Sequence, residues 1–431
     1  MSAPRPRVVI VGAGFGGLEA ARALRRAPVD VLLVDRHNYH LFQPLLYQVS
    51  VAALPPSEIA YPIRSIFRRQ RNLTFRIAEV ERVDPVRRVV VMGGSEIPFD
   101  YAILAPGSVT SFFDNASIPR HAFELKDLPG ALRLRNHLIR CFEAAIGADD
   151  PIERQAFLTI AVAGGGPTGV EVAGAVSELL RRLLRRDYPA LPAGDVRVLL
   201  YEGGPRVLAA FPESLSAAAA KSLVRIGVEV HTHTLVESFD GHTLTLRSGE
   251  SLRAGTLVWA AGVRATPLPA TLGIPVDSTG RVAVLPTLQT REHPEVFVVG
   301  DAARVDTPGG TVPAQAPPAI QMGRTAARNV ANALAGRPLE AFAYKDPGTM
   351  ATIGRKAAVA SIHGIRITGF PAWIVWLFVH LMQLVGFRNR IVVFVDWAWQ
   401  YVFYRPASPI ILSIDEETLH SKVLDDSARR T

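Results

Sequence analysis

The chain has 431 residues, of which 48% are hydrophobic and 20% charged, and a formal net charge of +8. This length and composition indicate two or three folded domains and exclude a disordered chain. Because no basic run interleaved with aromatic residues accompanies the charge, we expect an anionic membrane surface and no nucleic acid as partner.

The chain has one cysteine, Cys141, which excludes an intrachain disulfide framework and a Cys-X-X-Cys dithiol site. Cys and His clusters that bind metals are also missing from the sequence, so we expect no metal site. A β-branched run follows the first residues directly, without the long apolar segment of a signal peptide. We therefore expect the protein in the cytoplasm or on a cytoplasmic membrane face.

Residues 7–23 predict a strand, a glycine turn and a helix. Gly12, Gly14 and Gly17 give the spacing of a dinucleotide-binding turn, in which the helix N-terminus faces a pyrophosphate. The next apolar run, 31–34, ends at Asp35, whose carboxylate can accept hydrogen bonds from ribose hydroxyls. A glycine turn without a ligand is the structural alternative, but the order of strand, glycines, helix, strand and acid favours a nucleotide site.

Residues 36–63 mix aromatics, glutamines and prolines without a steady period, which predicts a loop with short helices over the cofactor or a packed connector. Segments 73–83 and 86–92 alternate as strands do, and 101–107 predicts a buried strand ending in the turn at Gly107. Together they predict a βαβ-type unit with an antiparallel insert.

A second glycine turn lies in residues 158–175. Gly164, Gly166 and Gly169 repeat the spacing of the first turn, and Glu171 falls where Glu19 falls in the first copy. The strand ending at Gly107 also has a counterpart, which ends at Gly262 at nearly the same offset. Two matching landmarks predict a duplicated fold with two dinucleotide-binding domains.

The second acid, Glu202, follows the strand predicted over 196–201. Its carboxylate can bind a free ribose 2′-hydroxyl but would repel a 2′-phosphate, so NADH is expected over NADPH, although Arg206 argues the other way. The intervening segment 179–194 extends the helix and carries a group of four arginines, for which a solvated face and a membrane-surface contact are the two interpretations. They are Arg181, Arg182, Arg185 and Arg186.

The chain then returns to the first domain with a short apolar strand over 295–300. It ends at Asp301, which is either a ligand of cofactor hydroxyls or phosphates or a turn-capping acid. Residues 319–334 predict a helix.

Two apolar segments near the C-terminus, 370–387 and 391–404, contain four of the five tryptophans. As a helix the first would be about 27 Å long, slightly short of a bilayer core, and the second carries Asp396 and Gln400. Neighbouring arginines favour helices lying in the headgroup region, with a buried hairpin or a dimer interface as the alternative.

Over nearly its whole length the chain resembles the type II NADH dehydrogenases, single-subunit flavoenzymes that pass electrons from NADH to a membrane quinone without pumping protons. The similarity rests on the segments HLFQPLLYQVSVAALPPSEIAYPIR, AGGGPTGVEVAGA, VFVVGDAA, YKDPGTMATIGRKAAVA and WIVWLFVHLMQLVGFRNR.

The resemblance implies non-covalent FAD in the first domain, bound by Gly12, Gly14, Gly17, Asp35, Gly107 and Asp301. It implies NADH in the second, bound by Gly166, Gly169, Glu202 and Gly262, with Glu171 close to the nicotinamide. Glu171 is then either a proton donor or a residue that interacts with the helix dipole.

Quinone would approach past Gln321 and Lys356, and we expect Lys356 to stabilise negative charge on flavin or quinone. Two positions depart from the family pattern. Pro317 stands where the family often has the first glutamine of AQxAxQ, with Gln315 displaced by two, and Ala105-Pro106-Gly107 replaces an ATG turn.

The expected fold class is α/β, with an FAD-binding domain over 1–115 and 280–345, an NADH-binding domain over 116–279 and a membrane-anchoring region over 346–431. We expect a peripheral protein on the cytoplasmic face of the inner membrane, with a homodimer as one option. A reductase of a soluble acceptor such as ferredoxin or rubredoxin and a slow flavin redox sensor are the competing functions. A sulfide:quinone reductase needs more thiols than Cys141 supplies.

Overall fold

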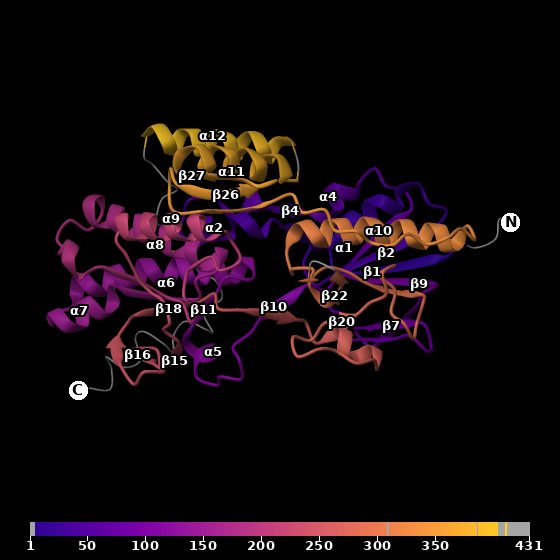
Figure 1. Ribbon diagram of the computed structural model, residues 1–431, viewed down its shortest axis with the longest axis horizontal. Helices are drawn as coiled ribbons and strands as arrows, with labels where there is room; N and C mark the ends of the chain where they lie inside the picture. The colour runs from indigo at the N-terminus through magenta and orange to yellow at the C-terminus, as the bar shows by residue number, and fades with distance from the viewer. Residues whose placement is uncertain (1–4, 308–309, 386, 404–409, 412–431) are drawn as a thin grey trace. The chain divides into compact units, whose positions relative to one another are not determined.

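The computed structural model describes residues 5–307, 310–385, 387–403 and 410–411. Tyr404 and the C-terminal region beyond 411 lie outside these ranges, as does the side chain of Gln400. The chain forms two compact units, one made of 1–41, 60–109 and 263–347 and the other of 42–59, 110–262 and 348–431 (Figure 1). The domain boundaries given above stay a prediction.

The first unit is built on a parallel five-stranded sheet. Its strand order is β21 (Val296–Val298), β9 (Tyr101–Leu104), β1 (Arg7–Val11), β2 (Asp30–Asp35) and β5 (Leu73–Ile77). Helices α1 (Phe15–Ala23) and α10 (Ala316–Leu334) cross with their backbones in close contact at Gly16 and Gly323. A Cβ on Gly323 would lie 2.1 Å from the carbonyl oxygen of Gly16, so only glycine fits there. An antiparallel sheet of β6 (Arg82–Asp84), β7 (Val89–Met92) and β8 (Ser95–Pro98) is the predicted insert.

The second unit repeats this plan. Its parallel sheet has the order β11 (Phe123–Glu124), β18 (Thr256–Trp259), β12 (Thr159–Ala163), β13 (Arg197–Tyr201) and β14 (Val228–His231). In both sheets the strand before the glycine turn, β1 or β12, is central. The strand that leads to the acid, β2 or β13, lies on one side of it, and β9 or β18 lies on the other. This correspondence confirms the predicted duplication and the α/β class.

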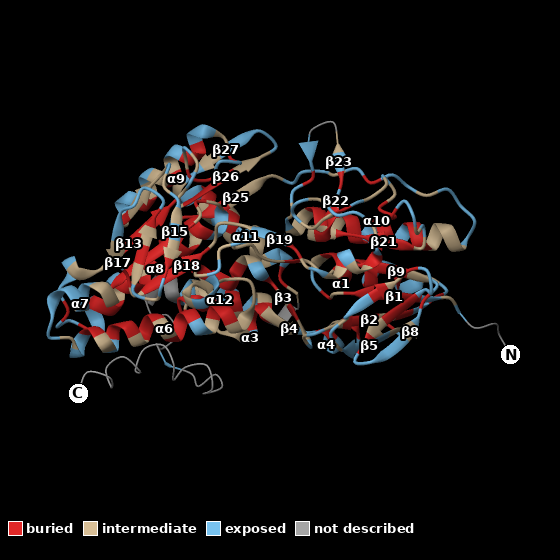
Figure 2. Ribbon diagram, turned by 90° about the horizontal axis from the view of Figure 1, so that it is seen from below, coloured by how far each residue is buried: buried red, intermediate tan, exposed pale blue. Residues whose placement is uncertain are grey.

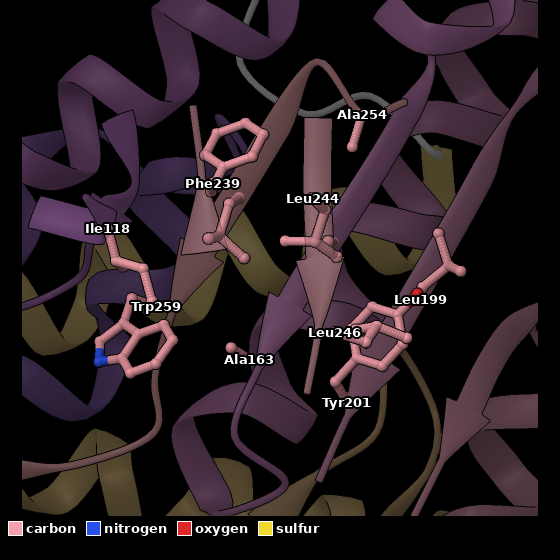
Figure 3. Close-up of a cluster of buried hydrophobic side chains, with 11 residues drawn as sticks. Ile118, Ala163, Leu199, Tyr201, Phe239, Leu244, Leu246, Ala254 and Trp259 are labelled. Atoms are coloured by element: carbon pink, nitrogen blue, oxygen red, sulfur yellow. The ribbon is translucent and has the colours of Figure 1, made fainter. Parts of the chain in front are cut away.

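The core of the second unit lies between its parallel sheet and a smaller sheet of β15 (Val236–Phe239), β16 (Thr243–Leu246) and β17 (Ser251–Arg253). Figure 3 shows Phe239 and Leu244 of the small sheet beside Leu199, Tyr201 and Trp259 of the parallel sheet. In Figure 2 the inner strands of both parallel sheets and the inner faces of their helices are largely buried. The helices include α8 (Pro167–Arg186) and α9 (Glu213–Arg225).

The C-terminal region packs within the second unit. An antiparallel sheet of β25 (Thr349–Thr352), β26 (Ala358–Ile362) and β27 (Ile365–Thr368) leads into α11 (Gly369–Gln383) and α12 (Phe387–Phe403). Figure 1 shows both helices, in yellow and orange, stacked over β26. Within the described ranges, no helix has the length and apolar character needed to cross a bilayer.

Two sequence-based expectations differ in detail. The run 36–63 forms β3 (Tyr39–Leu41), α2 (Leu46–Ser50), α3 (Pro56–Ile59) and β4 (Ala60–Pro62), which confirms a loop with short helices and adds a small β-ladder. The run 73–83 is two strands, because β5 joins the parallel sheet while β6 pairs with β7.

The remaining elements of the described chain are α4 (Ile63–Phe67), β10 (Ser108–Thr110), α5 (Ile118–His121), α6 (Leu128–Gly147), α7 (Pro151–Phe157), β19 (Val263–Ala265), β20 (Val282–Ala283), β22 (Ala303–Arg304), β23 (Asp306–Thr307), β24 (Gly310–Thr311) and the short 3-10 helices η1 (Leu24–Arg26), η2 (Gln43–Leu45), η3 (Ala193–Asp195), η4 (Leu268–Leu272) and η5 (Gly300–Ala302).

Candidate active site

In the first unit, each of the three glycines in the turn between β1 and α1 has a different structural role. Gly12 has φ +94°, and a Cβ there would lie 2.2 Å from the carbonyl oxygen of Ala105. A Cβ on Gly17 would lie 1.8 Å from the oxygen of Gly12. Gly14 has open space at its Cβ position, and no side chain caps the helix that it begins. The turn therefore leaves room and helix N-terminal amides for a phosphate.

The second unit has the same arrangement between β12 and α8. Gly164 has φ +107°, with a hypothetical Cβ 2.5 Å from the oxygen of Ala260, and a Cβ on Gly169 would lie 1.8 Å from the oxygen of Gly164. Gly166 faces open space and begins α8 without a side-chain cap. Both turns thus leave open space at the N-terminus of the helix that follows.

The two acids that follow bind their own glycine turns. Asp35 accepts hydrogen bonds from the backbone amides of Ala13 at 2.6 Å and His37 at 2.8 Å. Glu202 accepts from the amides of Gly165 and Gly204, both at 2.6 Å. Each carboxylate oxygen has more than one lone pair, so both acids keep acceptor capacity for a ribose.

Arg206, the residue that argued for NADPH, is bound to its own loop. Its guanidinium donates to the carbonyl oxygens of Phe211 at 2.8 Å, Ala209 at 2.7 Å and Leu208 at 3.4 Å. These bonds hold the guanidinium to the loop after β13, while Glu202 holds the position next to the glycine turn.

Asp301 and Gly107 lie at the carboxyl ends of neighbouring strands of the first sheet. Asp301 accepts a hydrogen bond from the hydroxyl of Ser108 at 2.5 Å, and Gly107 has φ +75° with open space around it. Carboxyl ends of parallel strands are where nucleotides bind in such folds. Sequence reasoning missed Ser108, although its place directly after the Gly107 turn was a usable signal.

Glu171 lies in the second turn of α8, partly buried, and accepts a hydrogen bond from the backbone amide of Thr352 in β25 at 3.3 Å. Burial, which disfavours the charged form, raises the pKa of its carboxyl group to about 8. Its hydrogen-bond partner comes from another element, so the carboxyl group does more than interact with its own helix dipole. A carboxyl with this pKa can give or take a proton near neutral pH.

A chain of hydrogen bonds continues from Thr352. Its hydroxyl is 3.0 Å from that of Tyr47, the amide of Gln48 donates to Tyr47 at 3.0 Å, and Trp397 of α12 donates to Gln48 at 3.0 Å. Burial also raises the pKa of Tyr47, which keeps this hydroxyl neutral. The residues of this chain were missed as a group, because no local pattern links positions so far apart in sequence.

Gln321 and Lys356 belong to different units. The side-chain amide of Gln321 donates to the backbone oxygen of Lys345 at 2.8 Å and accepts from its amide at 3.0 Å. Lys356 is exposed and has φ +102° in the turn between β25 and β26. Its charge lies near Glu178, which accepts a hydrogen bond from the backbone amide of Arg355 at 2.7 Å. Pro317 occupies the first turn of α10, which begins at Ala316 directly after its N-cap residue Gln315.

Gly262 and Cys141 complete the residues predicted from the sequence. Gly262 accepts a hydrogen bond from the amide of Ser111, and a Cβ there would lie 2.9 Å from the ring of Phe113. Cys141 is buried, and burial raises the pKa of its thiol to about 12, which leaves it unreactive at neutral pH. Within the described ranges no group of three His, Cys, Asp or Glu side chains could hold a metal ion.

Comparison with known proteins gives two family matches. Residues 6–323 match the pyridine nucleotide-disulphide oxidoreductase family, and residues 347–406 match the NDH2 C-terminal domain.

Two relatives from Mycobacterium tuberculosis are similar over most of their length. The type II NADH:quinone oxidoreductase Ndh is 38% identical over 93% of this chain and 89% of its own, and NdhA is 39% identical over 92% and 87%. Among solved structures, NDH2 from Plasmodium falciparum in complex with NADH aligns with a TM-score of 0.87 at 20% identity, over 94% of this chain and all of that chain. The chain belongs to the type II NADH:quinone oxidoreductases, as its motifs predicted.

Proposed function

We propose that this enzyme oxidises NADH and reduces a membrane quinone through a non-covalently bound FAD, without pumping protons. The observation that carries the proposal is the pair of equivalent nucleotide turns, each with an uncapped helix, an open glycine and an acid that retains acceptor capacity. When bound, FAD supplies the group that accepts a hydride from NADH and passes two electrons to quinone.

In the first unit, the α1 amides beside Gly14 would hold the FAD pyrophosphate and Asp35 the adenosine ribose. Gly107 and Asp301 would contact the ribityl and phosphate region, with Ser108 fixing the rotamer of Asp301. Gly12 and Gly17 shape the turn and do not need to touch the cofactor.

In the second unit, Gly166 and Gly169 would serve the NADH pyrophosphate in the same way. Glu202 would bind the ribose 2′-hydroxyl and repel a 2′-phosphate, and Arg206 is held by three backbone oxygens of its own loop. NADH is therefore the favoured donor. Gly262 would leave space near the nicotinamide.

Reduction of a quinone to a quinol takes up two electrons and two protons, one proton originating from NADH and one from solvent. Glu171 would carry the solvent proton, with its carboxyl group held by the backbone amide of Thr352. The hydroxyls of Thr352 and Tyr47 contact each other and would keep β25 in place beside this carboxyl group. Lys356 would stabilise negative charge on the way to quinol, and Gln321 would hold the 345 segment in place on the quinone side. The Lys356→Met variant should then reduce quinone more slowly and with a changed pH profile. An unchanged profile would remove Lys356 from the mechanism.

The exposed apolar side chains of α11 and α12 would lie in a lipid headgroup layer. Phe378 is 64% exposed, Phe394 58% and Trp399 51%, more apolar surface than a solvent-facing helix normally shows. We propose a peripheral location on the cytoplasmic face of the inner membrane, and a homodimer as the alternative to a monomer. The proposed division is an FAD-binding domain (1–115 and 280–345), an NADH-binding domain (116–279) and a membrane-anchoring region (346–431).

The test is to purify the full chain and record its absorption spectrum. A bound flavin should give a yellow protein whose colour NADH removes and a short-chain quinone restores. A protein that stays colourless with excess FAD, or that NADH bleaches but only a ferredoxin or rubredoxin re-oxidises, would contradict the proposal. Slow re-oxidation by every acceptor would instead favour a redox sensor.

A further inference from the structure

A pocket of about 670 Å³ in the second unit is unusually rich in arginine. Its lining includes arginines of α8, of the end of α9 and of the turn between β25 and β26, namely Arg181, Arg182, Arg185, Arg186, Arg225 and Arg355. Glu178 is the acidic residue of this lining. The proposed electron transfer does not use any of these arginines.

The arginines continue the helix face that carries Glu171. Positions 171, 175, 178, 182 and 185 recur every three or four residues and so lie on one face of α8. On the opposite face, Leu180, Leu183 and Leu184 are buried. Arg181 also lies close to the turn between α9 and β14, since a Cβ on Gly227 would come within clash distance of its guanidinium. The polar face of α8 is therefore turned toward the pocket.

The charge in this pocket is strongly one-sided, although the guanidinium of Arg186 also lies 3.8 Å from the carboxylate of Asp187. Burial raises the pKa of Glu178, whose carboxyl already accepts the Arg355 amide, so it compensates the arginines poorly. Arginine stays protonated at all physiological pH values, and its planar fork matches phosphate oxygens. Such a cluster favours an anionic ligand, and phosphate is the group that it fits best.

The other wall of the pocket is aromatic and apolar. Trp373, Trp376 and Leu377 of α11 and Trp397 of α12 line it. On the outside of α11, large apolar side chains recur every four residues and form an exposed stripe: Phe370 is 44% exposed, Ile374 45%, Phe378 64% and Met382 48%. The arginine cluster thus faces an aromatic and apolar wall, and the helix α11 that forms part of this wall also carries an exposed apolar stripe.

We propose that this pocket binds one anionic phospholipid, with its phosphate on the α8 arginines and its acyl chains along the tryptophans of α11 and α12. The proposal rests on the membrane association proposed above and adds lipid selectivity to it. A quinone head is neutral and a zwitterionic lipid carries its own cation, so neither explains six arginines around one pocket.

The test compares binding of the full-length enzyme to phosphatidylcholine vesicles with binding to vesicles that contain about one third phosphatidylglycerol. The variant Arg182→Gln/Arg185→Gln/Arg225→Gln removes three pocket charges. The matched control is Arg133→Gln/Arg247→Gln/Arg253→Gln, at exposed arginines of the same unit that do not line the pocket. Flotation with the vesicles measures the bound fraction.

Removing three arginines from a lipid surface is expected to lower the preference for the anionic vesicles by about a hundredfold. The wild type and the control variant should keep the full preference, and the pocket variant should lose about this much of it. Equal loss in both variants, or no loss in the pocket variant, would overturn the proposal. A pocket variant with unchanged lipid preference but a higher KM for a short-chain quinone would assign the pocket to quinone instead.

A second measurement needs no variant. Phosphatidylglycerol with brominated acyl chains should quench the tryptophan fluorescence of the wild type more strongly than equally brominated phosphatidylcholine does. Equal quenching would count against the proposal. Lipid-free NADH oxidation with a short-chain quinone, measured in parallel, tests the proposed function separately, because failure there leaves the lipid result intact and the reverse is also true.

Discussion

Asp35 and Glu202 occupy equivalent places in the two units, which allows their roles to be separated. Glu202→Gln should raise the KM for NADH roughly tenfold, because a hydrogen bond to a charged group contributes about 1.5–3 kcal/mol, and should weaken the preference over NADPH. The bound flavin should be unaffected. Asp35→Asn is the matched control and should lower flavin content while leaving the NADH preference unchanged. Steady-state kinetics with both nucleotides and the flavin-to-protein ratio are the measurements.

Glu171 should impose a pH limit on quinone reduction. Its pKa of about 8 means that the carboxyl group is protonated below this pH and charged above it. If it donates a proton, quinone reduction should fall as pH rises through about 8, and Glu171→Gln should be at least about tenfold slower and lose this step. Stopped-flow bleaching of the flavin by NADH should be unchanged. A wild-type pH profile in the Gln variant would contradict the proton-donor role.

The same group affects stability in a predictable direction. Because the pKa in the folded state is raised above the ordinary value of 4.5, Glu171 stabilises the fold fully below about pH 4.5 and loses that contribution as pH rises through about 8. Thermal unfolding of wild type and Glu171→Gln should therefore diverge with rising pH, with the Gln variant relatively more stable at pH 9. A pH-independent difference would mean that the carboxyl is not buried in solution.

The glycines of the nucleotide turns could be predicted because they lie close together in the sequence and few other residues fit at their positions. Asp35 ends a buried strand and Glu202 directly follows one, so both positions could be predicted from the sequence. The link from Glu171 through Thr352 to Tyr47 was not readable, since its members come from α8, β25 and α2. Only tertiary packing brings the carboxyl group of Glu171 close to Thr352 and Tyr47.

At the level of the strand–turn–helix element, glycines in one turn should respond differently to the same substitution. Gly17→Ala and Gly169→Ala place a methyl group 1.8 Å from a backbone oxygen and should lower stability by about 1–3 kcal/mol or more. Gly14→Ala and Gly166→Ala enter open space, so the proteins should fold but bind FAD and NADH, respectively, more weakly. Thermal melts and cofactor titrations separate the two classes. A large loss of stability in Gly14→Ala would contradict the assignment.

The boundaries of helices and strands could be predicted from the sequence only where a glycine or an acid marks the end of a buried run. The duplicated strands are short buried runs bounded by glycine or acid, and their predicted positions hold. Segment 73–83 divided because alternation does not reveal which sheet a strand joins. The strands β25 to β27 were not predicted, since their side chains alternate only in part and the pairing is set by turns such as that at Gly364, where φ is +84°.

For the whole molecule, the short apolar strand before Asp301 predicted that the chain returns to the first domain, and this strand, β21, pairs with β9 in the first sheet. The assignment of 42–59 to the second unit was not predictable. That connector contributes Tyr47 and Gln48 to contacts with β25 and α12, and such contacts depend on residues some 300 positions away.

The apolar outer surface of α11 gives the test of membrane association for the complete enzyme. Phe378 and Ile152 are both 64% exposed, but Phe378 lies in the stripe of α11 and Ile152 lies on α7. Phe378→Glu should reduce binding to vesicles by about tenfold or more, because a buried aromatic side chain contributes about 1.5–3 kcal/mol and the carboxylate adds a desolvation cost. Ile152→Glu should bind vesicles as the wild type does.

Neither substitution should change lipid-free NADH oxidation with a short-chain quinone, since both side chains are solvent-exposed. Activity with a long-chain quinone embedded in vesicles should fall only in Phe378→Glu. Equal vesicle binding by both variants would place the membrane contact elsewhere on the molecule, and loss of short-chain activity in Phe378→Glu would mean that α11 supports the active site rather than the membrane contact.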